Sequence, residues 1–143
     1  MVAWRMAVSG DAGAWAPIAS NRVMARRDLT GAVDFAYLER YAAHDQALVD
    51  EVLALFREQA AIWLRLLDPK APGEGWRDAA HSLKGSALGV GAFALADECE
   101  FGERAQGEIE RTVALDQIRD ALDKALADVA AYAHEQALRS LRS

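Results

Sequence analysis

The chain has 143 residues, about one domain, which is long enough to bury a hydrophobic core and too short to hold a large catalytic domain as well. Apolar residues make up 52% of it, with only three prolines and ten glycines, a composition typical of a packed helical protein rather than a disordered one. The net charge of −6 excludes general nucleic-acid binding, which requires an excess of lysine and arginine, and favours a protein partner.

Two features indicate where the protein resides. Cys99 is the only cysteine, so no internal disulfide can form, which fits a reducing cytoplasm. Within residues 1–20, Gly10, Asp11 and Gly13 interrupt the apolar residues before a signal-peptide core is complete. No other run approaches the ~20 apolar residues of a membrane span. We therefore expect a cytoplasmic protein that does not contact a membrane.

Two helices are predicted after an irregular beginning. Residues 1–30 lack a sustained hydrophobic period and are interpreted as an N-terminal arm or extension, followed by a domain over residues 31–143. Asp34 is expected to cap a short helix that ends near His44, and Asp45 to cap a second helix. Steps of three and four residues give this second helix an apolar stripe that ends near Leu67: Leu48, Val52, Leu55, Phe56, Trp63 and Leu66.

Pro69 and Pro72 end the second helix, because proline lacks a backbone donor and disfavours helical conformation in the residue before it. Three further helices are predicted, from near Glu74 to the glycines at 89 and 91, from about Ala92 to Gln106, and from about Val113 with Thr112 as its cap. There is no strand-like alternation and no long repeat. The sequence therefore predicts an all-α fold, an antiparallel up-down four-helix bundle with a short leading helix.

His81 lies at the centre of one face of the third helix. On a helical wheel, the face opposite His81 is apolar or small and is expected to pack in the core. The core-facing residues are Trp76, Ala79, Leu83, Ser86, Ala87 and Val90, and the residues around His81 are Arg77, Lys84, Gly85 and Leu88. His81 is therefore expected to point outward.

The residues beside His81 favour phosphoryl chemistry. Imidazole is partly unprotonated at neutral pH and is a good nucleophile that forms covalent intermediates. Gly85 lies one turn further along, although glycine within a helix costs about 1 kcal/mol relative to alanine. The missing side chain gives clearance for a partner or a tetrahedral group, and Lys84 is placed to meet negative charge.

The segment His81-Ser82-Leu83-Lys84-Gly85-Ser86-Ala87, followed by Gly91-Ala92, Leu95-Ala96 and Cys99, resembles the histidine phosphotransfer (HPt) domain family. The likeness extends over roughly residues 33–140. The pattern H-x-x-K-G alone would arise by chance in roughly one chain in a hundred of this length. Its place on an outward helical face and the residues that follow it make the resemblance specific.

This resemblance implies that His81 is phosphorylated on its distal ring nitrogen by the phospho-aspartate of a receiver domain and passes the phosphoryl group to another receiver. It also implies that Lys84 neutralises the phosphoryl charge and that Gly85 is the small residue of the docking surface. Arg77, Leu88 and Gly89 are further candidates for that surface. The expected function is that of a stand-alone phosphotransfer protein in a bacterial two-component phosphorelay.

The family is similar to this chain in having no nucleotide site, and the sequence contains neither a phosphate-binding loop nor a kinase glycine box. We therefore expect a phosphoryl carrier with no kinase activity of its own, no metal and no cofactor, the Mg²⁺ belonging to the receiver. The implied partners are response-regulator receiver domains and the receiver of a hybrid histidine kinase. The chain is expected to be a monomer.

The fourth helix departs from the family pattern. Glu98 and Gly102 occupy positions where the family usually has bulky apolar residues, so looser or rearranged packing is expected there. Some members orient the imidazole with a polar side chain from this helix, and both Glu103 and Gln106 are candidates here.

Two other functions fit a histidine on a helical bundle. One is an adaptor or inhibitor that binds receivers without turning over phosphate. The other is the dimerisation and phosphoacceptor module of a histidine kinase, but the acidic residue that usually follows its histidine is replaced by Ser82, and no proline follows Pro72.

The remaining residues capable of chemistry have simpler interpretations. His44 and His134 lack the spaced partners of a zinc site. Cys99 falls on the core side of its helix and is expected to be buried. The charged residues of the last helix, Asp128 among them, are expected to form a solvated face.

Overall fold

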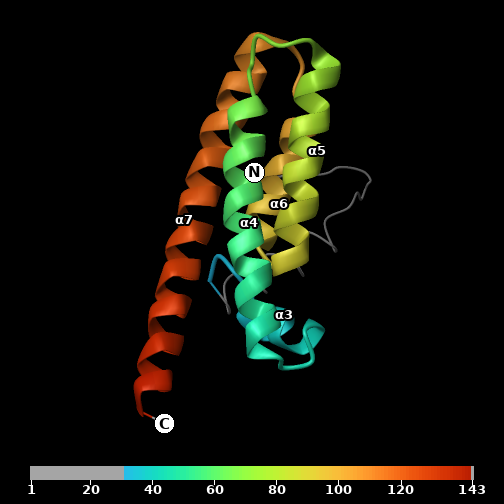
Figure 1. Ribbon diagram of the computed structural model, residues 1–143. Helices are drawn as coiled ribbons and strands as arrows, with labels where there is room; N and C mark the ends of the chain where they lie inside the picture. Colours follow the sequence, from blue (N-terminus) through green and yellow to red (C-terminus); the bar gives the residue numbers. More distant parts are fainter. Residues whose placement is uncertain (1–30, 143) are drawn as a thin grey trace, which may run out of the picture. The chain divides into compact units, whose positions relative to one another are not determined.

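The structure, a computed structural model, describes residues 31–142; the predicted arm over residues 1–30 lies outside the described residues. Four helices run alternately up and down, and a short helix crosses the base of the bundle before them (Figure 1). In chain order the helices are α3 (Phe35–Tyr41), α4 (Gln46–Leu66), α5 (Gly73–Val90), α6 (Phe93–Glu103) and α7 (Gly107–Arg142). The prediction of an antiparallel up-down bundle with a short leading helix is confirmed.

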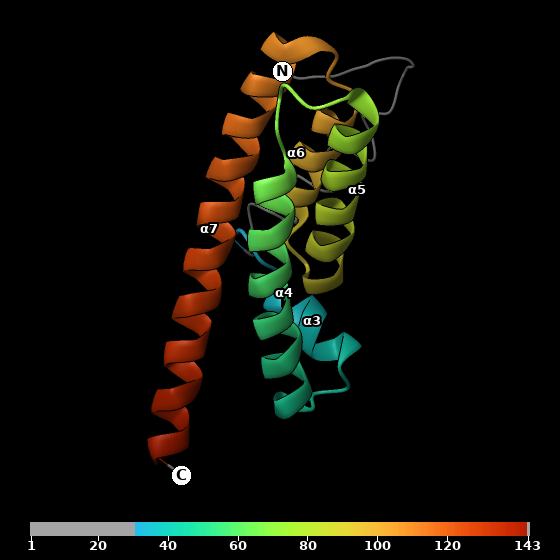
Figure 2. The same cartoon turned by 45° about the horizontal axis from the view of Figure 1, so that its top comes forward.

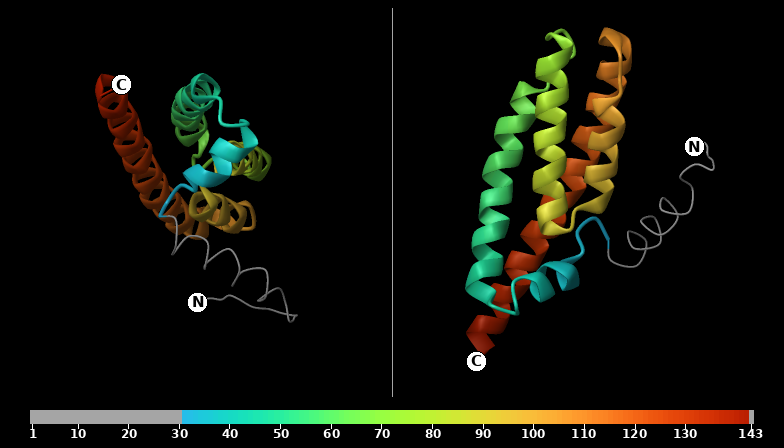
Figure 3. Two further views of the ribbon diagram at one scale, coloured as in Figure 1. Left: turned by 90° about the horizontal axis from the view of Figure 1, so that it is seen from below. Right: turned by 90° about the vertical axis from the view of Figure 1, so that its right-hand side faces the viewer.

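The four long helices form a ring in which each packs against the next along the chain, and α7 returns beside α4. Figure 2 and both views of Figure 3 show this order. At 1.5 Å per residue, the 36 residues of α7 span about 54 Å, against about 31 Å for the 21 residues of α4. The last turns of α7 therefore extend past the bundle, where they are largely exposed.

Two aspartates begin the first two helices, as predicted. The Asp34 carboxylate accepts a hydrogen bond from the backbone N–H of Tyr37 at 3.0 Å. The Asp45 carboxylate accepts one from Leu48 at 3.2 Å. Each satisfies a backbone donor that the first turn of a helix leaves unpaired.

Gly91, at the end of α5, contacts the residues that begin the leading helix α3. Gly91 caps the end of α5 with φ of 83°, a left-handed conformation that other residues rarely adopt. Its carbonyl accepts a hydrogen bond from the backbone N–H of Asp34 at 2.9 Å. A Cβ at this position would lie 2.9 Å from the carbonyl oxygen of Asp34, so the close approach also requires glycine.

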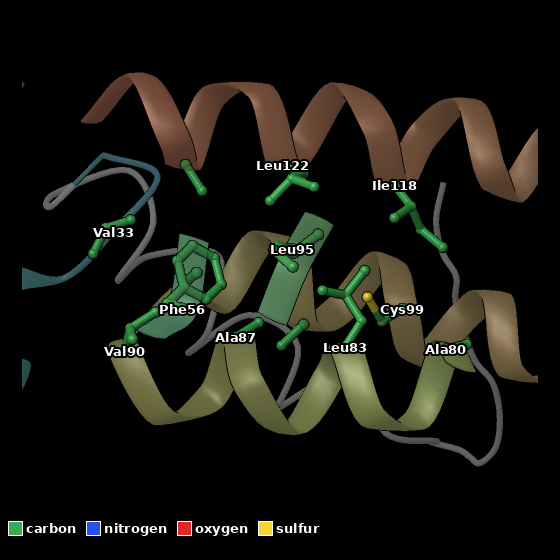
Figure 4. Close-up of a cluster of buried hydrophobic side chains, with 14 of the residues drawn as sticks. Val33, Phe56, Ala80, Leu83, Ala87, Val90, Leu95, Cys99, Ile118 and Leu122 are labelled. Carbon is green, nitrogen blue, oxygen red and sulfur yellow. The ribbon is translucent and has the colours of Figure 1, made fainter. Parts of the chain in front are cut away.

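The core fills the space between the four long helices, and Figure 4 shows the layer that α5, α6 and α7 share. Leu83, Leu95, Cys99 and Ile118 are fully buried there. Their packing holds α5 in one rotational setting, because turning the helix would bring its charged face into the core.

Gly102 corrects the expectation of looser packing on α6. It is buried, and a Cβ added to it would lie 3.1 Å from Cδ1 of Ile118. The indole N–H of Trp76 donates a hydrogen bond to the Gly102 carbonyl at 2.7 Å. The missing side chain thus makes room for Ile118 of α7, and Trp76 of α5 packs beside the same glycine.

The predicted apolar stripe of α4 is confirmed for Phe56, which is buried, and for Val52 and Trp63, which pack against the core, and is wrong for the other three residues. Leu48, Leu55 and Leu66 are exposed, and the buried residues of the helix are Val49, Leu53, Phe56 and Ala60. More than half of the residues of α4 are apolar. An apolar stripe with three- and four-residue spacing can therefore be drawn on this helix in two orientations about its axis. The small Ala60, which carried little weight in the pattern, lies at the centre of the buried side.

The beginning of the last helix also differs from the prediction. The helix starts at Gly107, and the hydroxyl of Thr112 donates to the Glu108 carbonyl within it at 2.8 Å instead of capping it. The Glu110 carboxylate accepts a hydrogen bond from the backbone N–H of Gln106 at 2.9 Å, which supplies the cap from inside the helix.

Asp128, expected on a solvated face, instead accepts hydrogen bonds from the backbone N–H groups of Ala32 and Val33 at 2.8 and 3.2 Å.

Within residues 31–142, no helix is long and apolar enough to cross a membrane.

Candidate functional site

His81 lies in the middle of α5 on the side that faces away from the core, and 70% of its side chain is exposed. The opposite side of the helix is buried, as the wheel predicts, through Trp76, Ala79, Leu83, Ala87 and Val90. The burial of that side fixes the direction of the histidine.

The end of α6 brings a carboxylate to the ring of His81. Because α5 and α6 run antiparallel, Glu103 lies beside His81 although 22 positions separate them in sequence. Its Oε1 is 3.3 Å from Nδ1 of His81. Of the two candidates for this contact, Glu103 reaches the ring, while Gln106 lies beyond the end of α6 and is exposed.

This contact determines which ring nitrogen is available for chemistry. A carboxylate only accepts hydrogen bonds, so the proton of a neutral imidazole lies on Nδ1 when it donates to Glu103. The lone pair then lies on Nε2. Within the described residues Nε2 has no hydrogen-bond partner, and it is therefore the nitrogen open to an incoming electrophile.

The same carboxylate binds Lys84. Nζ of Lys84 lies 2.8 Å from Oε2 of Glu103 and 4.0 Å from Oε1 of Glu100. The lysine side chain is only 20% exposed, so it lies against α6 instead of extending outward beside His81 as the wheel predicts. The reason is the pair of carboxylates that α6 places one turn apart.

Charges continue along α6 through an ion pair between Glu100 and Arg104, whose atoms approach to 2.9 Å. Neither residue was among the predicted site residues. The four-residue spacing of this pair was a detectable signal for an interaction on one helical face, but its proximity to His81 depends on how α6 packs against α5.

Arg77, the second predicted cation, is exposed and its side chain reaches back toward the beginning of α5. Its Nη1 would lie 3.2 Å from a Cβ built on Gly73. Side chains on a helix point toward its N-terminus, which carries this guanidinium away from His81.

The surface beyond His81 on α5 is open. Gly85 and Gly89 are both exposed, and a Cβ added to either would meet no atom within 4 Å. Leu88 is 43% exposed on the same side. Internal packing therefore gives no reason for glycine at either position.

Cys99 is buried, as predicted, and takes no part in this surface. Burial above all, and then the negative charge of Glu103, raise the pKa of its thiol to about 12. A thiol with so high a pKa stays protonated and is a poor nucleophile. The described residues contain no group of three or more potential metal ligands.

One solved structure matches the chain closely, that of the histidine phosphotransferase ShpA from Caulobacter crescentus. The two sequences are 62% identical, the TM-score is 0.67, and the match covers 78% of this chain and 99% of ShpA. No family model and no curated protein sequence matches the chain. At this identity and coverage, the chain belongs to the histidine phosphotransfer family, and its function is histidine phosphotransfer in a phosphorelay.

Proposed function

We propose that His81 is the phosphoryl-carrying residue, which accepts the group on Nε2 from a receiver phospho-aspartate and passes it to a second receiver. The observation that carries this proposal is the geometry of the imidazole, which is 70% exposed and is held at Nδ1 by Glu103 while Nε2 is left without a partner. The other two histidines of the chain have no such arrangement among the described contacts.

In the proposed step, the Nε2 lone pair attacks the phosphorus atom of the acyl phosphate. The bond between phosphorus and the aspartate oxygen breaks, and the aspartate leaves as a carboxylate with the bonding electron pair. The ring becomes cationic as the N–P bond forms, and the proton on Nδ1 remains hydrogen-bonded to Glu103. Onward transfer is the reverse reaction with the aspartate of another receiver.

The chain's contribution is positioning and charge, as is usual in phosphoryl transfer. Lys84 shares the Glu103 carboxylate with His81 and is assigned to neutralise the phosphoryl oxygens. Gly85 provides clearance for the receiver, and Leu88 and Gly89 belong to the docking surface, with Arg77 on the side nearer the start of α5. A receiver supplies its own Mg²⁺, so this chain needs no cofactor.

Family membership supports receiver domains as partners, because histidine phosphotransfer proteins act with them in phosphorelays. We propose that they are the receiver of a hybrid histidine kinase and one or more response regulators, and that the protein works as a monomer in the cytoplasm. Light scattering at micromolar concentration tests the monomer, because a histidine-kinase module would be an obligate dimer.

The test of His81 is phosphorylation by a labelled receiver. Incubated with a receiver phosphorylated on aspartate, the wild-type protein should gain label that is acid-labile and alkali-stable, and His81→Gln should gain none. His134→Gln, which replaces an exposed histidine on α7, is the matched control and should be labelled like wild type. Wild-type protein that stays unlabelled with several receivers, yet binds them, would refute the proposal and indicate an adaptor.

A further inference from the structure

A single carboxylate, that of Glu103, contacts both residues on which the proposed chemistry depends. One oxygen lies 3.3 Å from Nδ1 of His81, and the other lies 2.8 Å from Nζ of Lys84. Lys84 therefore already has a negative partner before any phosphoryl group arrives.

We propose that Glu103 is a positioning residue that pairs with Lys84 in the unphosphorylated protein. Forming phosphohistidine then requires Lys84 to leave the Glu103 carboxylate and bind the phosphoryl oxygens. This inference rests on the proposed role of His81. Its consequence is that the Lys84–Glu103 ion pair, which stabilises only the unphosphorylated protein, disfavours phosphorylation, whereas the hydrogen bond from Nδ1 to Glu103 favours it because the phosphorylated ring is cationic. Because of the ion pair, the phosphoryl group is more readily passed on.

Burial supports this exchange. The side chains of Lys84 and Glu103 are 20% and 22% exposed, so each is partly shielded from the water that weakens surface ion pairs. Oε2 of Glu103 is buried and accepts no well-directed hydrogen bond within the described part of the chain. The ammonium of Lys84 is its nearby counter-charge, and removing that charge from a shielded carboxylate is unfavourable.

Glu100 provides a weaker second partner for the lysine. It lies 4.0 Å from Nζ of Lys84, is more than half exposed, and is shared with Arg104. The attraction of Glu100 for Lys84 should therefore be weaker than that of Glu103. Substitution of Glu100 is thus a matched control on the same helix.

The test is the equilibrium of the phosphoryl group between this protein and one receiver, approached from both sides. Glu103→Gln removes the charge while leaving an amide oxygen that can accept from Nδ1 of His81. We expect the ratio of phosphorylated to unphosphorylated protein to rise about two- to fivefold, the range of a partly exposed ion pair. Glu100→Gln should change this ratio less.

A double substitution shows whether Glu103 acts through Lys84. In a Lys84→Ala background, Glu103→Gln should no longer raise the ratio. An unchanged or lowered ratio in the Glu103→Gln single variant, with the fold intact by circular dichroism, would overturn the inference. So would an equal rise in the Lys84→Ala background.

These outcomes are separable from a failure of the proposed function, in which wild-type protein itself is not phosphorylated. If the Glu103→Gln variant does not fold, NMR of the wild-type protein tests the inference instead. Upon phosphorylation of the wild-type protein, the NMR resonance of the Lys84 ammonium should shift, because its partner changes from a carboxylate to phosphoryl oxygens. A Lys84 resonance that phosphorylation leaves unchanged would overturn the inference.

Discussion

Gly85→Ala should stabilise the domain and, at the same time, slow phosphoryl transfer. The position lies within α5, where glycine is less stable than alanine by about 0.5–1 kcal/mol. An added Cβ would have no atom within 4 Å, so no clash offsets that gain. We therefore expect the free energy of unfolding to rise by about 0.5–1 kcal/mol, which raises Tm by about 2–6 °C in a domain of this size.

The slower transfer follows from the position of Gly85 one turn after His81 on the exposed side of α5. In the proposed transfer a docking receiver brings its aspartate to Nε2, and a displacement of about 1 Å from the reactive geometry is enough to lower a rate by up to about a hundredfold. The larger Gly85→Gln should slow transfer by roughly tenfold or more, and Gly85→Ala by less.

The assay pairs thermal unfolding by circular dichroism with the rate of label transfer from a phosphorylated receiver. Gly75→Ala is the control, because Gly75 also lies on α5 with nothing within 4 Å of an added Cβ but is located near the start of the helix, away from His81. This control should not slow transfer. Gly85→Gln with wild-type transfer rates would refute the clearance role, and a fall in Tm of Gly85→Ala would refute the stability argument.

Three further substitutions test other parts of the bundle. Ala43 has φ of 55°, which is unfavourable for a residue with a Cβ, so Ala43→Gly should raise the free energy of unfolding in urea by about 0.5–1 kcal/mol, and a decrease would contradict this reasoning. The Tyr132 hydroxyl donates to Glu39 at 2.8 Å, so Tyr132→Phe should lower the free energy of unfolding by about 1 kcal/mol; no change would show that the bond contributes nothing. Burial raises the pKa of Cys99 from 9.0 to about 12, so stability that depends on the neutral thiol is complete below pH 9.0 and is lost as the pH rises toward about 12. Urea unfolding across this span should show a smaller loss for Cys99→Ala than for wild type, and equal losses would argue against the burial effect.

Much of the fold follows from local signals in the sequence. Asp34 and Asp45 cap helices because a short acidic side chain can reach the unpaired N–H groups of the first turn, an interaction within three residues. The setting of α5 is also predictable, since its apolar residues occupy one side only and admit a single orientation. Local patterns of this kind need no knowledge of neighbouring helices.

The errors arise where a helix has more than one plausible setting or a residue has a distant partner. Leu48 and Leu55 fit the apolar spacing of α4 as well as the buried residues do, and only the packing of α5 and α7 against α4 decides between them. Gly102 indicates a gap until Ile118 of α7, whose Cδ1 would lie 3.1 Å from an added Cβ, is known to occupy it. Asp128 is an ordinary surface residue of a helix until the chain before α3 brings two backbone N–H groups to it.

The site shows the same division between local and distant information. His81, Lys84 and Gly85 lie within five consecutive residues, so one helical turn is enough to group them on the sequence. Glu103 contacts two of these residues, yet its place depends on the antiparallel pairing of α5 and α6 and on where α6 ends. Had α6 continued to Gln106 as predicted, both residues would have remained candidates. The antiparallel pairing of α5 and α6 places the Glu103 carboxylate against His81 and Lys84, and so gives an apparently free lysine a partner that we propose it exchanges during transfer.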